Sequence, residues 1–288
     1  MTMLLILLTA FIQVEPAAPS ALSDLHARRA AAAVALQEVL AASSAASDEA
    51  AVAALLRCAS DVASSDLGAS VSSHLRAAAA FAPAFAPPAA ARDYLRRALV
   101  EAAQSLAFRP VAEAPVPAGF PDFTPAGEIL LLDYPTVRLA RVPMSRSGNG
   151  AFWSLFLHIK GADIAMTAPV QTDYSAGADN GEPGPATMGF LYDLPDRGPA
   201  GTFGAVEVLD QPAVTVLSIG GRGWAGVDEV EALGQILRDH LAAQCPGWEL
   251  AGVIRVQEYN SPAVRGLRRF YEVQLPVRRV NAAASATE

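Results

Sequence analysis

Hydrophobic positions recur with a helical period over residues 22–108, and the pattern breaks near residues 46–48, 66–68 and 82–88. Ala, Leu, Arg, Glu and Gln, which are strong helix formers, fill most of this region. Leu95, Leu99, Ala102 and Leu106 share one stripe of the last segment, and Ser47 followed by two acids is a suitable helix start. The pattern predicts an all-α, alanine-rich region of four helices.

A different pattern repeats in the second half of the chain. LLDYPTVRLARV, starting at Leu131, aligns with VLDQPAVTVLSI, starting at Val208, 77 positions later. Each copy predicts two β-segments hinged at an x-Pro turn. Helical periodicity follows each copy, at residues 151–161 and 228–244. In the first helix it places Phe152, Leu155, Phe156 and Ile159 on one face and leaves Trp153 and Leu157 off it.

Each of these helices is followed by two segments with the pattern of β-strands. They cover residues 163–171 and 186–194 in the first copy, and 249–259 and 268–277 in the second. The second half therefore predicts an α+β domain made of a duplicated strand-helix-strand-strand unit. Such a duplication is expected to form one pseudo-symmetric sheet or open barrel, with two helices on one side and a cleft between the halves.

Breaks in composition give the expected organisation of the chain. Residues 1–21 combine a short apolar run with small residues and proline, which is typical of a secretory signal peptide and predicts an exported, periplasmic or secreted protein; an ordinary buried helix is the alternative. We expect a helical region at 22–108, a proline-rich linker at 109–127, a second domain at 128–280 and a disordered tail at 281–288. The apolar run is too short to span a bilayer.

Charge and cysteine content narrow the function classes. A formal net charge of -8 argues against a nucleic-acid partner, which would require a basic face. Cys58 and Cys245 lie in different halves of the chain with no Cys/His cluster, which favours two unrelated thiols over a metal site. A disulfide between the halves stays open if the chain is exported.

Several segments of the second half occur in an order that resembles the SOUL heme-binding proteins. They are FWSLFLHIKGADIAMTAPV, TMGFLYDLP, SIGGRG and YNSPAVRGLRRFYEVQLPV, and the resemblance covers about residues 128–280. It implies a distorted β-barrel with two helices and a capacity to bind heme or another porphyrin. Our first hypothesis is therefore a non-enzymatic tetrapyrrole carrier or buffer. It also implies that the ligand lies in an apolar groove beside the first helix and a late loop.

Candidate ligand contacts follow from what a porphyrin requires, namely an apolar face, cations for its propionates and a possible iron ligand. Trp153 and Leu157 are surplus apolar residues on the first helix; contact with the helical region is the alternative for them. His158 is a candidate axial ligand of heme iron, or a boundary histidine bonded to backbone. The further candidates are Met166 and Met188, which could also be packing residues, and Lys160, Arg265 and Arg268, which could also be solvated charges.

Two alternatives to a tetrapyrrole carrier remain open. Glu258 and Glu272, with Tyr259 and Tyr271 beside them, could serve a small-molecule hydrolase on the related gyrase-inhibitor-like fold. Strand alternation sends Glu272 and Tyr271 to opposite faces, so only one of that pair can face a given cleft. The other alternative is a partner-binding module whose groove is filled by its own helical region.

Overall fold

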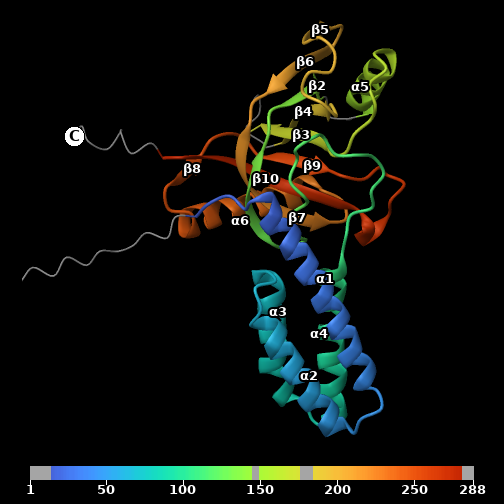
Figure 1. Ribbon diagram of the computed structural model, residues 1–288, viewed down its shortest axis with the longest axis vertical. Helices are drawn as coiled ribbons and strands as arrows, with labels where there is room; N and C mark the ends of the chain where they lie inside the picture. Colours follow the sequence, from blue (N-terminus) through green and yellow to red (C-terminus); the bar gives the residue numbers. More distant parts are fainter. Residues whose placement is uncertain (1–13, 145–148, 176–183, 281–288) are drawn as a thin grey trace, which may run out of the picture.

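The computed structural model describes residues 14–144, 149–175 and 184–280, and these form a helical bundle attached to one end of a sheet domain (Figure 1). The bundle confirms the four predicted helices and their breaks. Its core consists of leucines and alanines, including Leu36, Leu55, Leu75, Leu95 and Leu99. The helices are α1 (Pro19–Ala42), α2 (Asp48–Ala63), α3 (Ala69–Phe81) and α4 (Pro88–Ala107), with a short 3₁₀ turn η1 (Ala82–Ala84) between the last two.

The sheet domain holds two further helices and ten strands in the described residues. All pairs between these strands are antiparallel, and β1 and β5 lie at the two ends of the sheet, which is not closed. The helices are α5 (Asn149–Gly161) and α6 (Val227–Gln244). The strands are β1 (Ile129–Tyr134), β2 (Val137–Pro143), β3 (Val170–Ser175), β4 (Gly184–Leu191), β5 (Gly201–Phe203), β6 (Val206–Gln211), β7 (Val214–Arg222), β8 (Trp248–Leu250), β9 (Arg255–Glu258) and β10 (Phe270–Arg279).

The sequence repeat appears directly in the strand order, which is β1-β7-β10-β9-β3-β4-β2-β6-β5, with β8 paired to β10. The order from β1 to β6 is symmetric about its centre. Each strand of the first copy has its counterpart at the equivalent place on the other side: β1 corresponds to β6, β2 to β7, β3 to β9 and β4 to β10. The pseudo-two-fold therefore passes between β3 and β9, where Gln171 pairs with Gln257 and accepts a hydrogen bond of 2.9 Å from its side-chain amide. The duplicated unit predicted from the sequence is confirmed.

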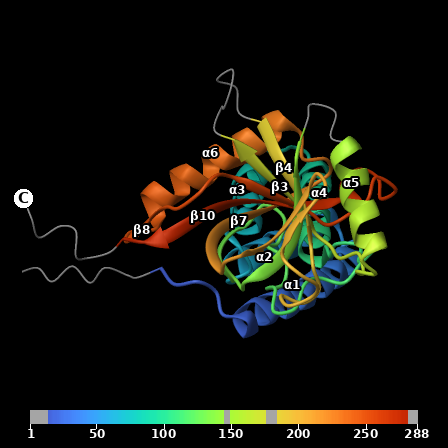
Figure 2. The ribbon, with the colours of Figure 1, turned by 90° about the horizontal axis from the view of Figure 1, so that it is seen from above.

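The two faces of the sheet are covered differently. Leu155 and Ile159 of α5 and Val230 and Leu237 of α6 pack on the same face, as predicted. The opposite face carries buried polar side chains near its centre and is covered by the start of α1 and by the linker 109–127 (Figure 2). Alternation along each strand separates these two sets of residues.

Three expectations need correction. Residues 163–169 are not a strand, because β3 begins only after Pro169, which has no N–H to give to a ladder. The segment 249–259 is interrupted between β8 and β9. Phe152 does not belong to the core stripe: it is partly exposed, and Ala151 takes the buried position above Leu155.

The helical bundle is joined to the sheet by buried polar contacts. The Glu128 carboxylate, at the edge of β1, accepts hydrogen bonds from the backbone N–H groups of Ser70 and Val71 at the start of α3 and from the guanidinium of Arg29 on α1. His26 of α1 lies 2.9 Å from the carbonyl oxygen of Phe123 in the linker. The two regions with different compositions are therefore not independent bodies.

The ends of the described chain bear on two further predictions. Helix α1 begins at Pro19, and the carbonyl of Val14 accepts a hydrogen bond from the indole of Trp248. Most of the predicted signal peptide and the whole predicted tail 281–288 lie outside the described residues.

Cys58 and Cys245 are both free thiols, which confirms the prediction of two unrelated cysteines.

Candidate functional site

A groove of about 510 Å³ lies between α5 and the loop that joins β9 to β10, and we call it the α5 groove. Its lining is largely apolar and aromatic. Helix α5 and the loop before β3 supply one side, and residues 258–262 with Arg269 supply the other. The lining residues are Glu113, Ala114, Phe152, Trp153, Phe156, Met166, Thr167, Ala168, Val170, Met188, Trp224, Glu258, Tyr259, Asn260, Ser261, Pro262 and Arg269.

Helix α5 places its surplus aromatic residues at the groove because its buried stripe is narrow. Phe152 and Phe156, one turn apart, stack with ring centroids 6.2 Å apart, and Trp153 meets Phe156 edge to face at 5.6 Å. Trp153 is 59% exposed and Leu157 is 64% exposed, so neither is covered by the helical bundle. None of the lining residues comes from α1 to α4, which argues against a groove filled by those helices.

The predicted methionines meet in the groove. Met166 lies in the loop before β3 and Met188 on β4, and both also pack against the apolar cluster beneath α5. Their thioethers are thus available to a ligand and to the core at once, which suits the flexibility of methionine.

One end of the groove carries opposite charges. Arg269 is buried, its guanidinium lies 3.6 Å from the centre of the Trp224 ring, and it faces Glu258 at 3.4 Å. Burial raises the pKa of the Glu258 carboxyl, while Arg269 opposes the shift. The groove therefore offers one cation held in place by an aromatic ring, together with a carboxyl that takes up a proton more readily than usual.

Other predicted contacts lie outside the groove. His158 and Leu157 line a separate hollow of about 440 Å³ on the other side of α5, where a ring nitrogen of His158 lies 2.9 Å from the hydroxyl of Tyr192. Burial lowers the pKa of His158, so its neutral form is favoured. Lys160 is exposed near the end of α5, and Arg265 and Arg268 are exposed on the loop behind Arg269.

Glu272 occupies a closed polar cluster on the opposite face of the sheet. Its carboxylate accepts hydrogen bonds from the hydroxyls of Tyr134 and Tyr259 at 3.1 Å each and from the side-chain amide of Gln274 at 2.8 Å. The backbone N–H of Thr124, in the linker, donates to it at 2.5 Å. Burial raises the pKa of Glu272, opposed by these hydrogen bonds. The carboxyl is fully buried, so the linker bars a substrate from it.

Tyr271 and Tyr259 separate as strand alternation predicts. Tyr271 lies on the helix-covered face, where its hydroxyl donates to Glu229 of α6 at 3.3 Å, and burial raises its pKa to about 12. Tyr259 borders the groove, but its hydroxyl is directed to Glu272. Of the predicted acid-base set, Glu258 alone presents its reactive group to the α5 groove.

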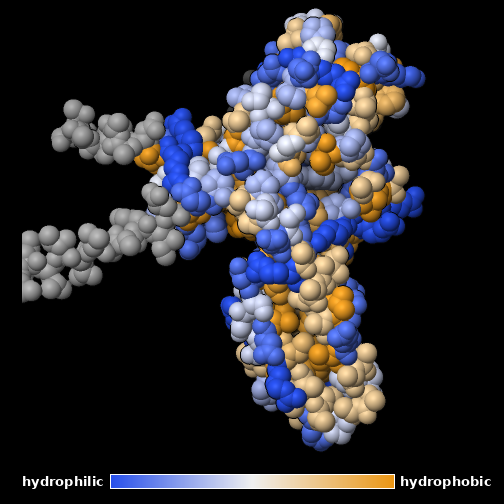
Figure 3. All heavy atoms as spheres, in the orientation of Figure 1, coloured by the Kyte–Doolittle hydropathy of each residue, from blue (hydrophilic) through white to orange (hydrophobic). Residues whose placement is uncertain are grey.

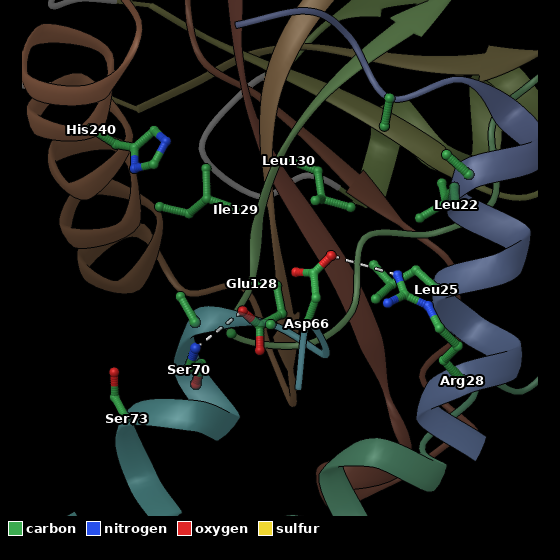
Figure 4. A pocket seen from close by; sticks show the side chains of 15 residues that line it. Leu22, Leu25, Arg28, Asp66, Ser70, Ser73, Glu128, Ile129, Leu130 and His240 are labelled. Atoms are coloured by element: carbon green, nitrogen blue, oxygen red, sulfur yellow. Dashed lines mark hydrogen bonds and ion pairs between the residues drawn. The ribbon is translucent and has the colours of Figure 1, made fainter. Parts of the chain in front are cut away.

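A second hollow, of about 610 Å³, lies where α1 and α3 meet β1 and α6 (Figure 4). Its charged groups Arg28, Asp66 and Glu128 already have partners. Arg28 lies 3.7 Å from Asp66, and Glu128 is bound to the amides at the start of α3. It is a junction between the bundle and the sheet, with a mainly apolar floor of Leu22, Ile129 and Leu130.

Two features of the groove have no counterpart among the residues predicted from the sequence. Trp224 follows the glycine-rich turn after β7 and was not singled out, although an aromatic residue in such an exposed turn is itself a signal. The linker was treated only as a spacer, yet Glu113 accepts from both the backbone N–H (2.7 Å) and the hydroxyl (2.8 Å) of Ser261 at the edge of the groove.

The described residues contain no group of three or more His, Cys, Asp or Glu side chains arranged to hold a metal ion. Within the same residues, every helix is too short or too polar to cross a bilayer.

Comparisons with known proteins give only partial likenesses. No protein-family model matches the chain, and no curated protein matches it. Among solved structures, EcmrR in its complex with DNA is 16% identical, with a TM-score of 0.42, and the match covers 53% of this chain and 58% of that one.

The isolated C-terminal domain of EcmrR gives 16% identity and a TM-score of 0.37 over 53% of this chain and 98% of its own. A hydrolase from Listeria innocua gives 12% identity and a TM-score of 0.41 over 54% and 94%. All these scores are low, so no functional conclusion follows from them.

Proposed function

We propose that the chain is a SOUL-type tetrapyrrole-binding protein, a carrier or buffer that holds heme or another porphyrin in the α5 groove. In this proposal, the open sheet with α5 and α6 corresponds to the distorted β-barrel of the SOUL proteins. The observation that carries it is the lining of the groove: five aromatic residues and two methionines around about 510 Å³. Binding sites for small molecules usually measure roughly 300–1,000 Å³ and are mostly apolar.

The geometry supports binding through the face of the ring system. The Phe152 and Phe156 rings are nearly parallel, with 9° between their planes, so a planar ligand could extend this stack. Arg269 suits a propionate, because a guanidinium binds carboxylates in a bidentate manner. A bound propionate would compete with Glu258, and protonation of Glu258 would favour the ligand.

Axial ligation by His158 stays a separate proposal. Its ring lies on the far side of α5 from the groove lining and is bonded to Tyr192. Met166 and Met188 are the groove residues with an atom that could contact iron. We therefore expect the apolar face of the groove, more than an iron ligand, to determine affinity.

A titration of the full chain with hemin and with metal-free protoporphyrin tests this proposal. We expect saturable binding of both, with affinities within about tenfold of each other, because a strong iron bond would add more than ~1.4 kcal/mol. The double variant Trp153→Ala/Phe156→Ala should lose most of the binding, while His158→Ala and the distant exposed control Phe81→Ala should keep it. Absence of saturable binding of either porphyrin would exclude the carrier.

A second candidate function is hydrolysis of a small molecule with Glu258 as the acid-base group. The favouring observation is its raised pKa in an apolar groove, since such a carboxyl can hold and release a proton nearer neutral pH. Any hydrolytic activity found with ester or amide probes should disappear in Glu258→Gln. Porphyrin binding should persist in that variant, which separates the two functions.

Export of the chain remains part of the proposal. It follows from the sequence of residues 1–21 alone. Expression of the full gene in a bacterial host, followed by N-terminal sequencing of the periplasmic fraction, tests it. Recovery of the uncut chain from the cytoplasm only would contradict it.

A further inference from the structure

Three of the four large apolar side chains that the described part of the sheet domain exposes most belong to the α5 groove or to the loop that carries Arg269; the fourth, Leu157, lines the separate hollow beside His158. Trp224, in the turn after β7, is 60% exposed, and Leu267, in the short 3₁₀ helix η2 (Gly266–Arg268), is 65% exposed. Trp153 stands on the opposite edge of the groove. We call Trp153, Trp224 and Leu267, with the arginines beside them, the groove lip.

Arginines surround the apolar residues of the lip. Arg265 and Arg268 are exposed on either side of Leu267, and Arg222 donates a hydrogen bond of 2.8 Å to the Leu267 carbonyl. Among the described residues, no ion pair involves any of these three arginines, whereas Arg269 behind them pairs with Glu258. Figure 3 shows apolar atoms bordered by strongly hydrophilic ones where this loop projects.

The acidic groups near the lip are either engaged or on another element. Glu113 is bound to Ser261, and Glu258 lies inside the groove facing Arg269. Asp228, Glu229 and Glu231 are exposed at the start of α6, where the Glu229 carboxylate accepts a hydrogen bond from the Tyr271 hydroxyl. The lip is therefore locally basic on a chain whose formal net charge is -8.

We propose that the groove lip docks on the surface of an anionic lipid bilayer. Tryptophan and leucine beside arginine are the side chains that enter the boundary between headgroups and acyl chains, and exposed arginines are attracted to anionic headgroups. The overall negative charge repels the rest of the protein from such a surface, so the basic lip sets the orientation. The groove then opens toward the apolar layer.

Docking itself does not depend on the ligand, but its purpose rests on the proposed function. An apolar tetrapyrrole dissolves in membranes better than in water, and a groove that opens toward the bilayer would exchange it without passage through solvent. A failed porphyrin titration would leave the lip and its docking in place. Failed docking would leave the titration unaffected.

Co-sedimentation of the full chain with vesicles tests the docking. One set consists of phosphatidylcholine alone, the other of equal parts phosphatidylcholine and phosphatidylglycerol. We expect binding at least about tenfold stronger to the anionic set, weakened by added salt because exposed charges are screened. Trp153 and Trp224 should shift their fluorescence to the blue on binding, while Trp248, which is already buried, contributes a constant signal.

Variants separate the lip from general charge effects. Arg265→Glu/Arg268→Glu should abolish the preference for anionic vesicles, and Trp224→Ser/Leu267→Ser should weaken binding to both vesicle sets. The matched control Arg57→Glu/Arg97→Glu changes the net charge equally, at exposed positions on α2 and α4, and should bind like the natural chain. Equal binding to both vesicle sets, lip variants that bind normally, or a control that loses binding as much as they do would each overturn the proposal.

Discussion

The buried contact between Glu128 and Arg29 gives the sharpest prediction about stability. The two side chains are 4% and 1% exposed and lie 3.4 Å apart. Glu128 also accepts from the backbone N–H groups of Ser70 at 3.1 Å and Val71 at 3.4 Å, so it caps α3 from another region of the chain. Glu128→Ala removes all three interactions and leaves Arg29 charged and buried.

The expected loss of unfolding free energy depends on the hydrogen bonds that Arg29 retains. Removing one partner of a buried ion pair costs about 3–5 kcal/mol, because the remaining charge loses its compensation. Arg29 keeps hydrogen bonds to the carbonyls of Leu67 and Ser105, which places the cost near the lower end. We expect Glu128→Ala to lower the free energy of unfolding by about 3 kcal/mol. Glu128→Gln, which keeps an acceptor for α3, should cost about 1–2 kcal/mol.

Equilibrium unfolding in urea measures these differences. Far-ultraviolet circular dichroism reports mainly on the helices, while fluorescence reports on the sheet domain, since Trp153, Trp224 and Trp248 all lie there. If Glu128 joins the two regions, both signals should change in a single transition. The exposed control Asp66→Ala, which breaks an ion pair of 3.7 Å, should stay within about 0.5 kcal/mol.

Two results would refute this reasoning. One is a Glu128→Ala variant within about 1 kcal/mol of the natural chain, since a loss that small is typical of an exposed pair. The other is separate transitions for the two signals in the natural chain.

Three further predictions concern single sites. The pKa of the Glu272 carboxyl is raised in the folded protein above its ordinary value of 4.5. The free energy of unfolding should therefore fall as pH rises from about 4.5 through the folded-state pKa. Urea unfolding at several pH values should show this dependence in the natural chain and a flatter one in Glu272→Gln. Leu155→Ala should cost about 2–5 kcal/mol and the neighbouring Leu157→Ala less than about 0.5 kcal/mol, since the first is fully buried and the second exposed; equal losses would contradict the assignment of the α5 faces. Titration with a thiol reagent should find two free thiols in the native chain before any reductant is added, and the half-buried Cys58 should react before the buried Cys245.

Local patterns were sufficient for the helices, for the hinges between strands and for the duplication. The 3.6-residue period and the break residues located α1 to α4, and the two Asp-x-Pro motifs, Asp133 to Pro135 and Asp210 to Pro212, located the hinges between β1 and β2 and between β6 and β7. These features depend on which residues are near in sequence, which is the information that a pattern contains.

The wrong expectations involved contacts between distant segments. Phe152 falls within the apolar arc of α5, but Ala151 and Leu155 take the buried positions, and Phe152 lines the groove instead. The segment 163–169 has strand-like composition, but Pro169 delays pairing until β3. Packing against the neighbouring sheet determined the first result, and a single residue without an N–H group determined the second.

For the candidate site, the sequence identified most of the residue types but not their grouping. It predicted Trp153, Met166 and Met188 as ligand contacts, and the structure brings all three to one groove. It placed His158 beside that groove, but successive residues on a helix point about 100° apart, and the turn of α5 directs His158 to Tyr192. Glu258 and Glu272 had equal standing in the sequence, and only the closing of the linker over Glu272 distinguished them.

The sequence by itself determined the helices, the strand hinges, the duplicated unit and the apolar surplus of α5, because each is encoded in short-range spacing of side chains. Tertiary structure decided which surplus residues form a groove, which carboxyl is sealed and how the helical region is fixed to the sheet. Those outcomes depend on Thr124, Arg29 and Trp224 meeting residues far away in the chain. Burial and charge pairing act through space, so only the folded chain sets them.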